Sequence, residues 1–310
     1  ICAFAQDGTA QWTVFIYLCG TDLESDDSEA TLNLQSLLSA PATGAVNYVI
    51  QTGGTKEWHM EEIDPGKTER FVINNGTMTK VDSLPLEDMG KSDTLGRFLS
   101  WGAKAYPAEK YMAILWDHGG GPLSGAIWDE LHEDSHMTVP ELAEGISQAG
   151  VPFEIIGFDA CLMGSIEIAH MLAPYGKYFV ASEETEPGSG WAYEQLGTFL
   201  AEYPDTNGVY LGKLICDTFK WANDSSILLP NSHTLSVIDL AKIAPLSEAL
   251  GSLIQEWGDI IPDIVDYQVL IHDLASTEKY TAGSTIDIGD MVLRAESLDP
   301  LSTQKVRIAM

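Results

Sequence analysis

Apolar runs alternate with amphipathic segments along most of the chain, and both kinds of segment have the length of regular secondary structure. The runs are rich in Val, Ile, Phe and Tyr, which is typical of strands buried on both faces of a sheet. They are residues 12–18, 46–51, 111–116, 153–158 and 178–181. Apolar side chains recur at helical intervals in residues 29–38, 93–105, 139–146, 211–222 and 246–257. Strands that alternate with helices predict an α/β fold with a mostly parallel central sheet.

A different pattern interrupts this alternation after the second run. Short alternating pieces at 58–63, 70–73 and 78–81 are separated by Asp-Pro-Gly and Asn-Asn-Gly, which are turn sequences. They predict small antiparallel strands attached to the main sheet. A further strand is predicted at 234–240.

No low-complexity linker or internal repeat divides the sequence. We therefore expect one domain over residues 1–310, with a tail at 1–11, a core at 12–230 and a C-terminal extension of the same domain at 231–310. Ala3-Phe4-Ala5 fits the A-x-A pattern of a signal-peptidase site, although an ordinary chain terminus fits as well.

Composition narrows the classes of partner. The chain has 46 acidic and 16 basic residues, a formal net charge of −30, which opposes binding to nucleic acid or to anionic membranes and favours cationic substrates. Four widely spaced cysteines form neither a disulfide framework nor a CxxC motif. No apolar run is long enough to cross a bilayer, so membrane insertion is not expected.

Two of the buried runs end on reactive side chains. The run 111–116 leads into Asp117-His118-Gly119-Gly120, and the run 153–158 leads into Asp159-Ala160-Cys161. With a helix predicted between them, the two runs form parallel neighbours whose carboxyl ends share one sheet edge. A Cys-His pair is the expected product. We also expect a helix that begins at Cys161, whose dipole would favour the thiolate.

These residues admit other interpretations. A lipase-type His-Gly loop needs a G-x-S-x-G elbow, which the chain lacks, and a phosphatase loop needs arginine where Glu167 stands. Cys161 as an inert buried thiol and Asp159 as a helix N-cap stay open. His132 and His136 have zinc-ligand spacing if they lie on a helix, but a solvated acidic loop is the plainer interpretation.

The two blocks around His118 and Cys161 resemble the clostripain family of cysteine peptidases, which is grouped with caspases, legumain and gingipains. The resemblance extends from about Trp12 through residues 182–188 to residues 237–240. It implies a caspase-like three-layer α/β/α sandwich and a secreted or cell-surface bacterial cysteine endopeptidase that cleaves after basic P1 residues, Arg over Lys. It makes Cys161 the nucleophile and His118 the base and acid.

The same resemblance and the chemistry of acyl transfer extend the site. Backbone amides of Gly119 and Cys161 are the candidate oxyanion donors. Asp159 is expected to receive the P1 cation, and Ser182, Glu183 and Glu184 are expected to form another pocket wall. The alternative is a catalytically silent caspase-fold protein that binds basic peptides. Peptides with exposed Arg or Lys are the expected partners, and a monomer is expected.

Some features depart from the family pattern. Relatives are commonly matured by a cut after a basic residue between the histidine and the cysteine, but residues 119–160 contain no Lys or Arg. The enzyme then works as one chain or is cut elsewhere, for instance near Lys104, Lys110 or Lys177. Relatives usually continue past Met310, so a truncated chain and a shorter variant are both open. No cofactor or metal ligand set is predicted. Calcium, which some relatives use, stays possible although the chain lacks a D-x-D-x-D-G loop.

Overall fold

The computed structural model describes residues 9–133, 135–223, 234–260, 277–280, 285–296 and 300–310. The chain divides into two compact units, residues 1–238 and 239–310, and each is described by itself. A single domain over 1–310 stays a prediction. The Ala3-Phe4-Ala5 motif lies outside the described residues.

The first unit is built on an eight-stranded sheet with the strand order β10-β9-β8-β5-β1-β2-β3-β4. The strands are β1 (Ala10–Cys19), β2 (Val46–Gly53), β3 (Lys67–Asn74), β4 (Thr77–Pro85), β5 (Ala108–Trp116), β8 (Phe153–Asp159), β9 (Gly176–Ser182) and β10 (Leu235–Asp239). The run β9-β8-β5-β1-β2 is parallel, while β2-β3 and β3-β4 are antiparallel. The mostly parallel sheet and the antiparallel addition are confirmed.

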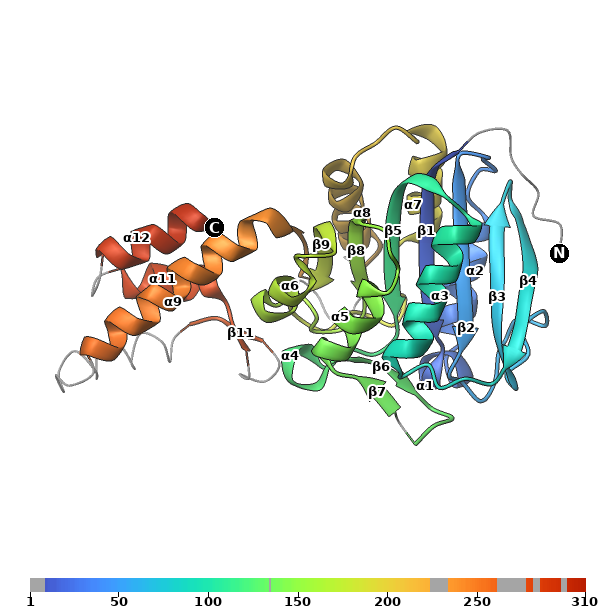
Figure 1. The fold of residues 1–310 in the computed structure, drawn as a ribbon, viewed down its shortest axis with the longest axis horizontal. Coiled ribbons are helices and arrows are strands. Elements are labelled where there is room, and N and C mark those ends of the chain that lie inside the picture. Colours follow the sequence, from blue (N-terminus) through green and yellow to red (C-terminus); the bar gives the residue numbers. More distant parts are fainter. Residues whose placement is uncertain (1–8, 134, 224–233, 261–276, 281–284, 297–299) are drawn as a thin grey trace. The chain divides into compact units, whose positions relative to one another are not determined.

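Helices cover both faces of this sheet (Figure 1). One layer consists of α2 (Glu29–Leu38), α7 (Tyr193–Glu202) and α8 (Gly208–Asn223), and the other of α3 (Ser92–Ala105), α5 (Val139–Ser147) and α6 (Ile166–Leu172). β1 is apolar on both sides because it lies between the layers. Ile16 joins the core with Leu34 of α2, whereas Phe15 packs edge-on against Phe98 of α3, with ring centroids 5.9 Å apart. The α/β/α sandwich is confirmed.

Two predicted elements are wrong in ways that bear on the site. Residues 58–63 form bends and turns instead of a strand, and their alternation arises because Trp58, Met60 and Ile63 are buried in the core. The helix after the cysteine does not begin at Cys161. It is α6, whose N-cap is Ser165, with Oγ accepting a hydrogen bond from Ile168 N.

Several short elements at the carboxyl edge of the sheet were not predicted. They are α1 (Thr21–Ser25), α4 (Gly121–Ser124), β6 (Ala126–Asp129) and β7 (Ser135–Met137). β6 and β7 pair as a small antiparallel sheet. These segments surround the end of β5, where the predicted site lies.

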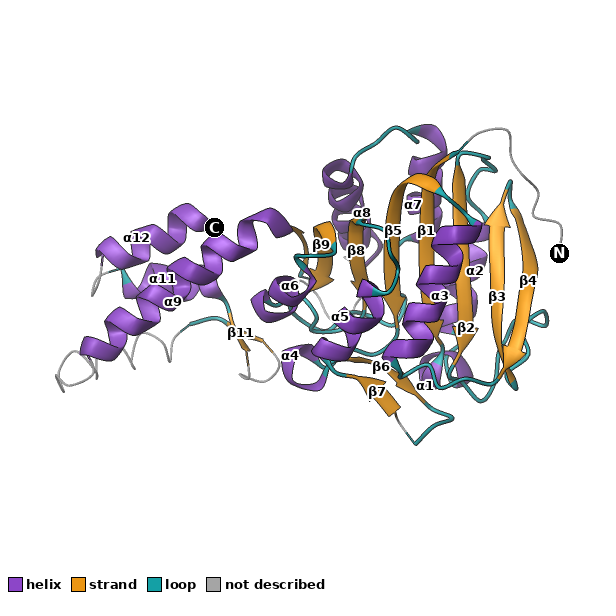
Figure 2. Ribbon diagram, in the orientation of Figure 1, coloured by secondary structure: helices purple, strands orange, loops and turns teal. Residues whose placement is uncertain are grey.

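The second unit is mainly helical (Figure 2). It contains η1 (Leu240–Lys242), α9 (Ile243–Ile260), β11 (Lys279–Tyr280), β12 (Thr285–Ile286), α11 (Ile288–Ala295) and α12 (Pro300–Ala309). Leu253 and Trp257 of α9 pack with Met291 and Val292 of α11 and with Val306 of α12. Within the described ranges, each helix is too short or too polar to span a bilayer.

Candidate active site

The ends of β5 and β8 bring the two predicted reactive residues to one edge. Trp116 pairs with Asp159 in the parallel register, so His118 and Cys161 each follow their strand by two residues. The backbones are in close contact, because a Cβ added to Gly119 would overlap the carbonyl oxygen of Cys161 and lie 3.0 Å from its carbonyl carbon. Only glycine fits here, which explains the His-Gly sequence.

The loop after His118 leaves one backbone amide available. Gly119 and Ala126 form an isolated bridge, but its hydrogen bonds come from the flanking amides, Gly120 N to Gly125 O at 2.8 Å and Ile127 N to His118 O at 3.3 Å. Among the described residues, the Gly119 amide has no backbone acceptor. It is therefore free to donate to a substrate oxyanion.

His118 has a carboxylate partner that sequence reasoning missed. Its Nε2 lies 2.8 Å from Asp22 Oδ1 on α1, and both side chains are partly exposed. Partial burial would raise the pKa of Asp22, but the hydrogen bond and charge of His118 outweigh burial and hold this pKa below its usual value. A carboxylate on Nε2 fixes the ring and leaves Nδ1 for the thiol.

A second missed carboxylate, Asp117, fixes the loops on either side of His118. It is buried, and its oxygens accept hydrogen bonds from Thr21 Oγ1 at 2.8 Å and Trp128 N at 2.6 Å. Burial raises its pKa well above the usual value. Asp117 directly precedes His118 in the sequence, whereas Asp22 could have been suspected only from its closeness to a strand end, because nothing in its spacing pairs it with His118.

Cys161 lies in a turn, so a helix dipole does not act on its thiol. Its Sγ accepts a hydrogen bond from Glu186 N at 3.2 Å. Burial raises the pKa of the thiol, and the Glu186 hydrogen bond lowers it less than burial raises it. The prediction of a thiol activated by a helix N-terminus is therefore wrong for this structure. The next residue, Leu162, has φ of 66°, a left-handed conformation that keeps the turn tight.

Asp159 lies beneath the reactive edge and is almost fully buried. Its Oδ2 accepts hydrogen bonds from Tyr193 Oη at 2.8 Å and Trp191 N at 3.2 Å. Burial raises its pKa to about 6. The N-cap interpretation is wrong, since α6 is capped by Ser165. A Cβ on Gly190 would lie 2.8 Å from both oxygens of Asp159, so this glycine lets the loop close over the carboxylate.

A further carboxyl group that sequence reasoning missed faces Asp159. Both side-chain oxygens of Glu186 are buried, and they accept no hydrogen bond within the part of the chain that the structure describes. Burial, together with the charge of Asp159, raises the pKa of Glu186 well above its usual value. The segment Glu184-Thr185-Glu186-Pro187-Gly188 carries two acidic residues and two turn residues beside a strand end, which is too weak a signal to assign a site.

The predicted pocket-wall residues pair with the turn that carries Cys161. Leu162 N donates to Glu184 O at 3.1 Å, and Gly164 N donates to Ser182 O at 2.6 Å. The Ser182 side chain is buried against Thr234 Oγ1 at 3.1 Å, and Glu183 N donates to Thr234 O at 3.2 Å. Ser182, Glu183 and Glu184 therefore lie next to the cysteine turn. The backbone carbonyl groups of Ser182 and Glu184 accept hydrogen bonds from this turn.

His132 and His136 do not share a helix. His136 lies on β7 and stacks on Trp128, with ring centroids 4.8 Å apart. His132 Nδ1 lies 3.0 Å from Asp129 Oδ2. With Asp88, these two residues place potential metal ligands within 4.8 Å of one another. An imidazole with two carboxylates suits a transition metal better than calcium, which prefers oxygen. This group therefore does not support the calcium prediction.

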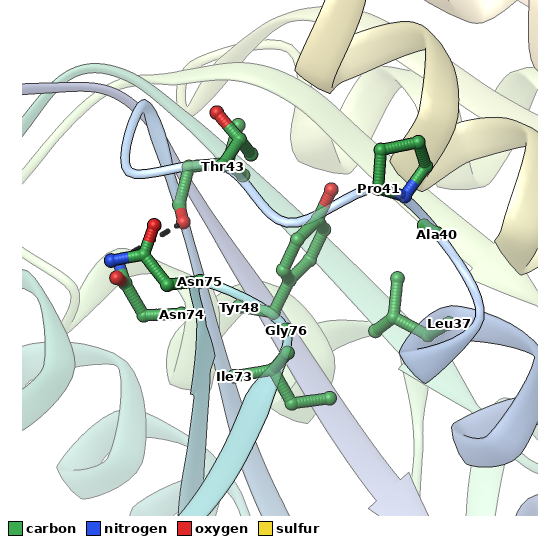
Figure 3. A pocket seen from close by; sticks show the side chains of 10 residues that line it. Leu37, Ala40, Pro41, Thr43, Tyr48, Ile73, Asn74, Asn75 and Gly76 are labelled. Atoms are coloured by element: carbon green, nitrogen blue, oxygen red, sulfur yellow. Dashed lines mark hydrogen bonds between the residues drawn. The ribbon is translucent and has the colours of Figure 1, made fainter.

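A small hollow lies away from this edge, at the amino end of β2 (Figure 3). Leu37, Pro41, Ile73 and Gly76 line it, and Tyr48 points into it. Burial raises the pKa of Tyr48. Because β2 runs parallel to β1 and β5, this hollow lies at the end of the sheet opposite to His118 and Cys161.

The fold of this chain is that of a known class of protein, the C11 cysteine proteases. The fold is shared with secreted C11 cysteine proteases from Bacteroides thetaiotaomicron. One, called iotapain, has a TM-score of 0.72 at 20% identity over 97% of this chain and 85% of that chain. Another, in complex with an irreversible peptide inhibitor, has a TM-score of 0.64 at 22% identity over 79% and 71%. An inactive zymogen C11 protease from Parabacteroides distasonis has a TM-score of 0.72 at 19% identity over 98% and 82%.

The sequence comparisons name the family. The profile of the clostripain family (peptidase C11) matches residues 71–306, which is more than half of the chain. The chain belongs to the clostripain family of cysteine peptidases. Clostripain from Hathewaya histolytica is 29% identical over 127 residues, which is 35% of this chain and 24% of that protein. The match thus spans about a quarter of the curated relative. The resemblance read from the two sequence blocks is confirmed.

Proposed function

We propose that this chain is a cysteine endopeptidase that hydrolyses peptide bonds after basic P1 residues, Arg in preference to Lys. His118 and Cys161 form the dyad, and Asp159 receives the P1 cation. The observation that supports the proposal best is the placement of a buried carboxylate two residues before a thiol whose backbone touches the His-Gly loop. Carboxylates pair with guanidinium through two parallel hydrogen bonds and with ammonium as a point charge.

The mechanism uses groups at the ends of β5 and β8. His118 takes the thiol proton, and Cys161 Sγ attacks the scissile carbonyl carbon. The amides of Gly119 and Cys161 donate to the oxyanion. Collapse of this intermediate breaks the C–N bond, and His118 passes its proton to the leaving amine. Water, deprotonated by His118, then hydrolyses the thioester and restores the thiol. Asp22 holds the ring through Nε2, which makes it a positioning residue.

Ser182, Glu183 and Glu184 support the pocket by holding the turn after Cys161. The proposed substrates are proteins and peptides with exposed Arg or Lys, and the net charge of −30 favours their approach. We propose a secreted or cell-surface location, as for the secreted relatives, with no required cofactor.

The test compares two fluorogenic peptides that differ only at P1, Arg or Asp. The Arg peptide is expected to be hydrolysed, Cys161→Ala to abolish its hydrolysis, and Asp159→Asn to raise KM for Arg far more than it changes Cys161 alkylation by iodoacetamide. Equal turnover of both peptides would refute the basic P1 preference.

A second candidate is the catalytically silent protein that binds basic peptides. The raised pKa of the Cys161 thiol favours it, because burial opposes the thiolate. It predicts that Arg peptides bind the protein but are never hydrolysed, even after limited proteolysis by trypsin, which could release a zymogen. Turnover lost in Cys161→Ala would exclude it.

A further inference from the structure

Two carboxyl groups from different elements are buried beside the turn that carries Cys161. Asp159 ends β8, and Glu186 comes from the loop that follows β9. Each group perturbs the other, and both are buried. Asp159 Oδ2 is occupied by Tyr193 and Trp191, whereas no hydrogen bond reaches Oδ1 among the described residues. Both Glu186 oxygens also lack a donor there. The two buried oxygens of Glu186 are thus left open next to Asp159.

Burying two ionised carboxylates next to each other without a cation costs free energy. Two buried carboxylates cannot both ionise in contact, so the pair keeps a proton between them. The other titratable groups facing the pair do not supply a positive charge. They are Glu29 of α2, Cys161, Tyr193 of α7 and Cys216 of α8. No positively charged side chain of the described residues therefore neutralises the pair. One bound cation with several N–H donors would do so.

We propose that Glu186 is the second anionic group of the P1 pocket. In the empty pocket it shares a proton with Asp159, and the guanidinium of a P1 arginine replaces that proton and bridges both carboxylates. The proton leaves to solvent, so one positive charge is exchanged for another and the pair becomes fully ionised. This inference rests on the proposed function. It explains a preference for Arg, whose planar fork offers five N–H donors where an ammonium offers three.

Glutamine at 186 keeps the size of the side chain but removes its charge. In active enzyme, Glu186→Gln is expected to raise KM for the Arg peptide about tenfold, equivalent to about 1.4 kcal/mol, and to leave kcat within about twofold. The Lys peptide is expected to lose less. Benzamidine, an unreactive amidinium, is expected to inhibit the variant with an equally raised Ki. Glu186→Asp, which keeps the charge on a shorter chain, is expected to lie between.

The pH dependence supplies a readout that a purely structural role would not move. In the parent enzyme, benzamidine must displace a proton, so its binding strengthens as pH rises above the ordinary carboxyl pKa. In Glu186→Gln only Asp159 of the pair titrates. The increase in benzamidine affinity with pH is therefore expected at lower pH than in the parent. The matched control is Glu194→Gln, an exposed carboxylate on α7, which should change neither Ki nor its pH dependence.

Three results would overturn the inference, and they are distinguishable. An unchanged Ki in Glu186→Gln would make Glu186 a bystander, while the basic P1 preference stands. A lower Ki in that variant would show that Glu186 excludes the cation. If benzamidine inhibits the parent no better than neutral benzamide, while Cys161 is alkylated and other peptides are cleaved, the basic P1 preference itself fails, and this inference with it.

Discussion

Replacing Gly119 by alanine tests the geometry on which the site depends. The φ angle of Gly119 lies outside the left-handed region, so the backbone conformation suits alanine and the effect is purely steric. The added Cβ would overlap Cys161 O and lie 3.0 Å from Cys161 C and 3.1 Å from Cys161 N. These atoms are backbone, and they cannot rotate away as a flexible side chain would.

The size of the effect follows from this overlap. Relief requires the His118 loop and the cysteine turn to separate by on the order of 1 Å, and a misplacement of that size costs about 100-fold in rate. The same displacement weakens the alignment of the Gly119 amide with the oxyanion. Overpacking of this kind costs about 1–3 kcal/mol of stability, so we expect Gly119→Ala to fold but to lose about 100-fold in kcat.

The assay is hydrolysis of the Arg peptide, with the urea midpoint measured on the same preparations. Gly251→Ala is the matched control, because Gly251 lies in α9 and a Cβ there would meet nothing within 4 Å. Alanine is favoured over glycine in a helix by about 0.5–1 kcal/mol, so the control should be slightly more stable and fully active. If Gly119→Ala keeps kcat within twofold, the close approach of the two strand ends has no part in catalysis.

Four further outcomes are expected. Alkylation of Cys161 by iodoacetamide, followed by mass spectrometry with Cys161→Ala as blank, should still accelerate beyond pH 9 because burial raises the pKa of the thiol; a plateau below pH 7 would contradict this. Asp22→Asn should lower kcat about tenfold with KM unchanged, since the carboxylate that orients His118 is partly exposed and water replaces it in part; an unaltered kcat would remove Asp22 from the site. Asp129→Asn should cost about 1–3 kcal/mol in urea unfolding, because buried Asp129 accepts hydrogen bonds from Met89 N at 2.7 Å and Leu131 N at 2.8 Å; an unchanged midpoint would mean that the loop relaxes. The pKa of Glu186 is raised on folding, so the folded state holds its proton more tightly and stability falls as pH rises above the ordinary carboxyl pKa. Glu186→Gln should therefore gain stability over the parent at pH 8 but not at pH 4, and a gain equal at both pH values would disprove the titration.

The sequence by itself determined the sheet and the placement of His118 and Cys161 at one edge of it. Apolar runs at 111–116 and 153–158 can be satisfied only inside a layered α/β core, and their parallel pairing places His118 and Cys161 at one edge, whatever the loops do. The role of Gly119 could be predicted in the same way, because a glycine after a histidine at a strand end indicates a close approach of two backbones.

Tertiary structure alone decided the chemistry around that edge. Asp22 beside His118 and Glu186 beside Asp159 come from other segments of the sequence, and their spacing carries no periodic signal. Asp117 adjoins His118, but only the fold buries it against Thr21 and Trp128. The state of the thiol was also hidden, because it depends on burial and on Glu186 N rather than on the helix start that the local pattern suggested. Hydrophobic periodicity encodes which face of an element is buried, whereas pKa values depend on which groups the fold brings within a few ångströms.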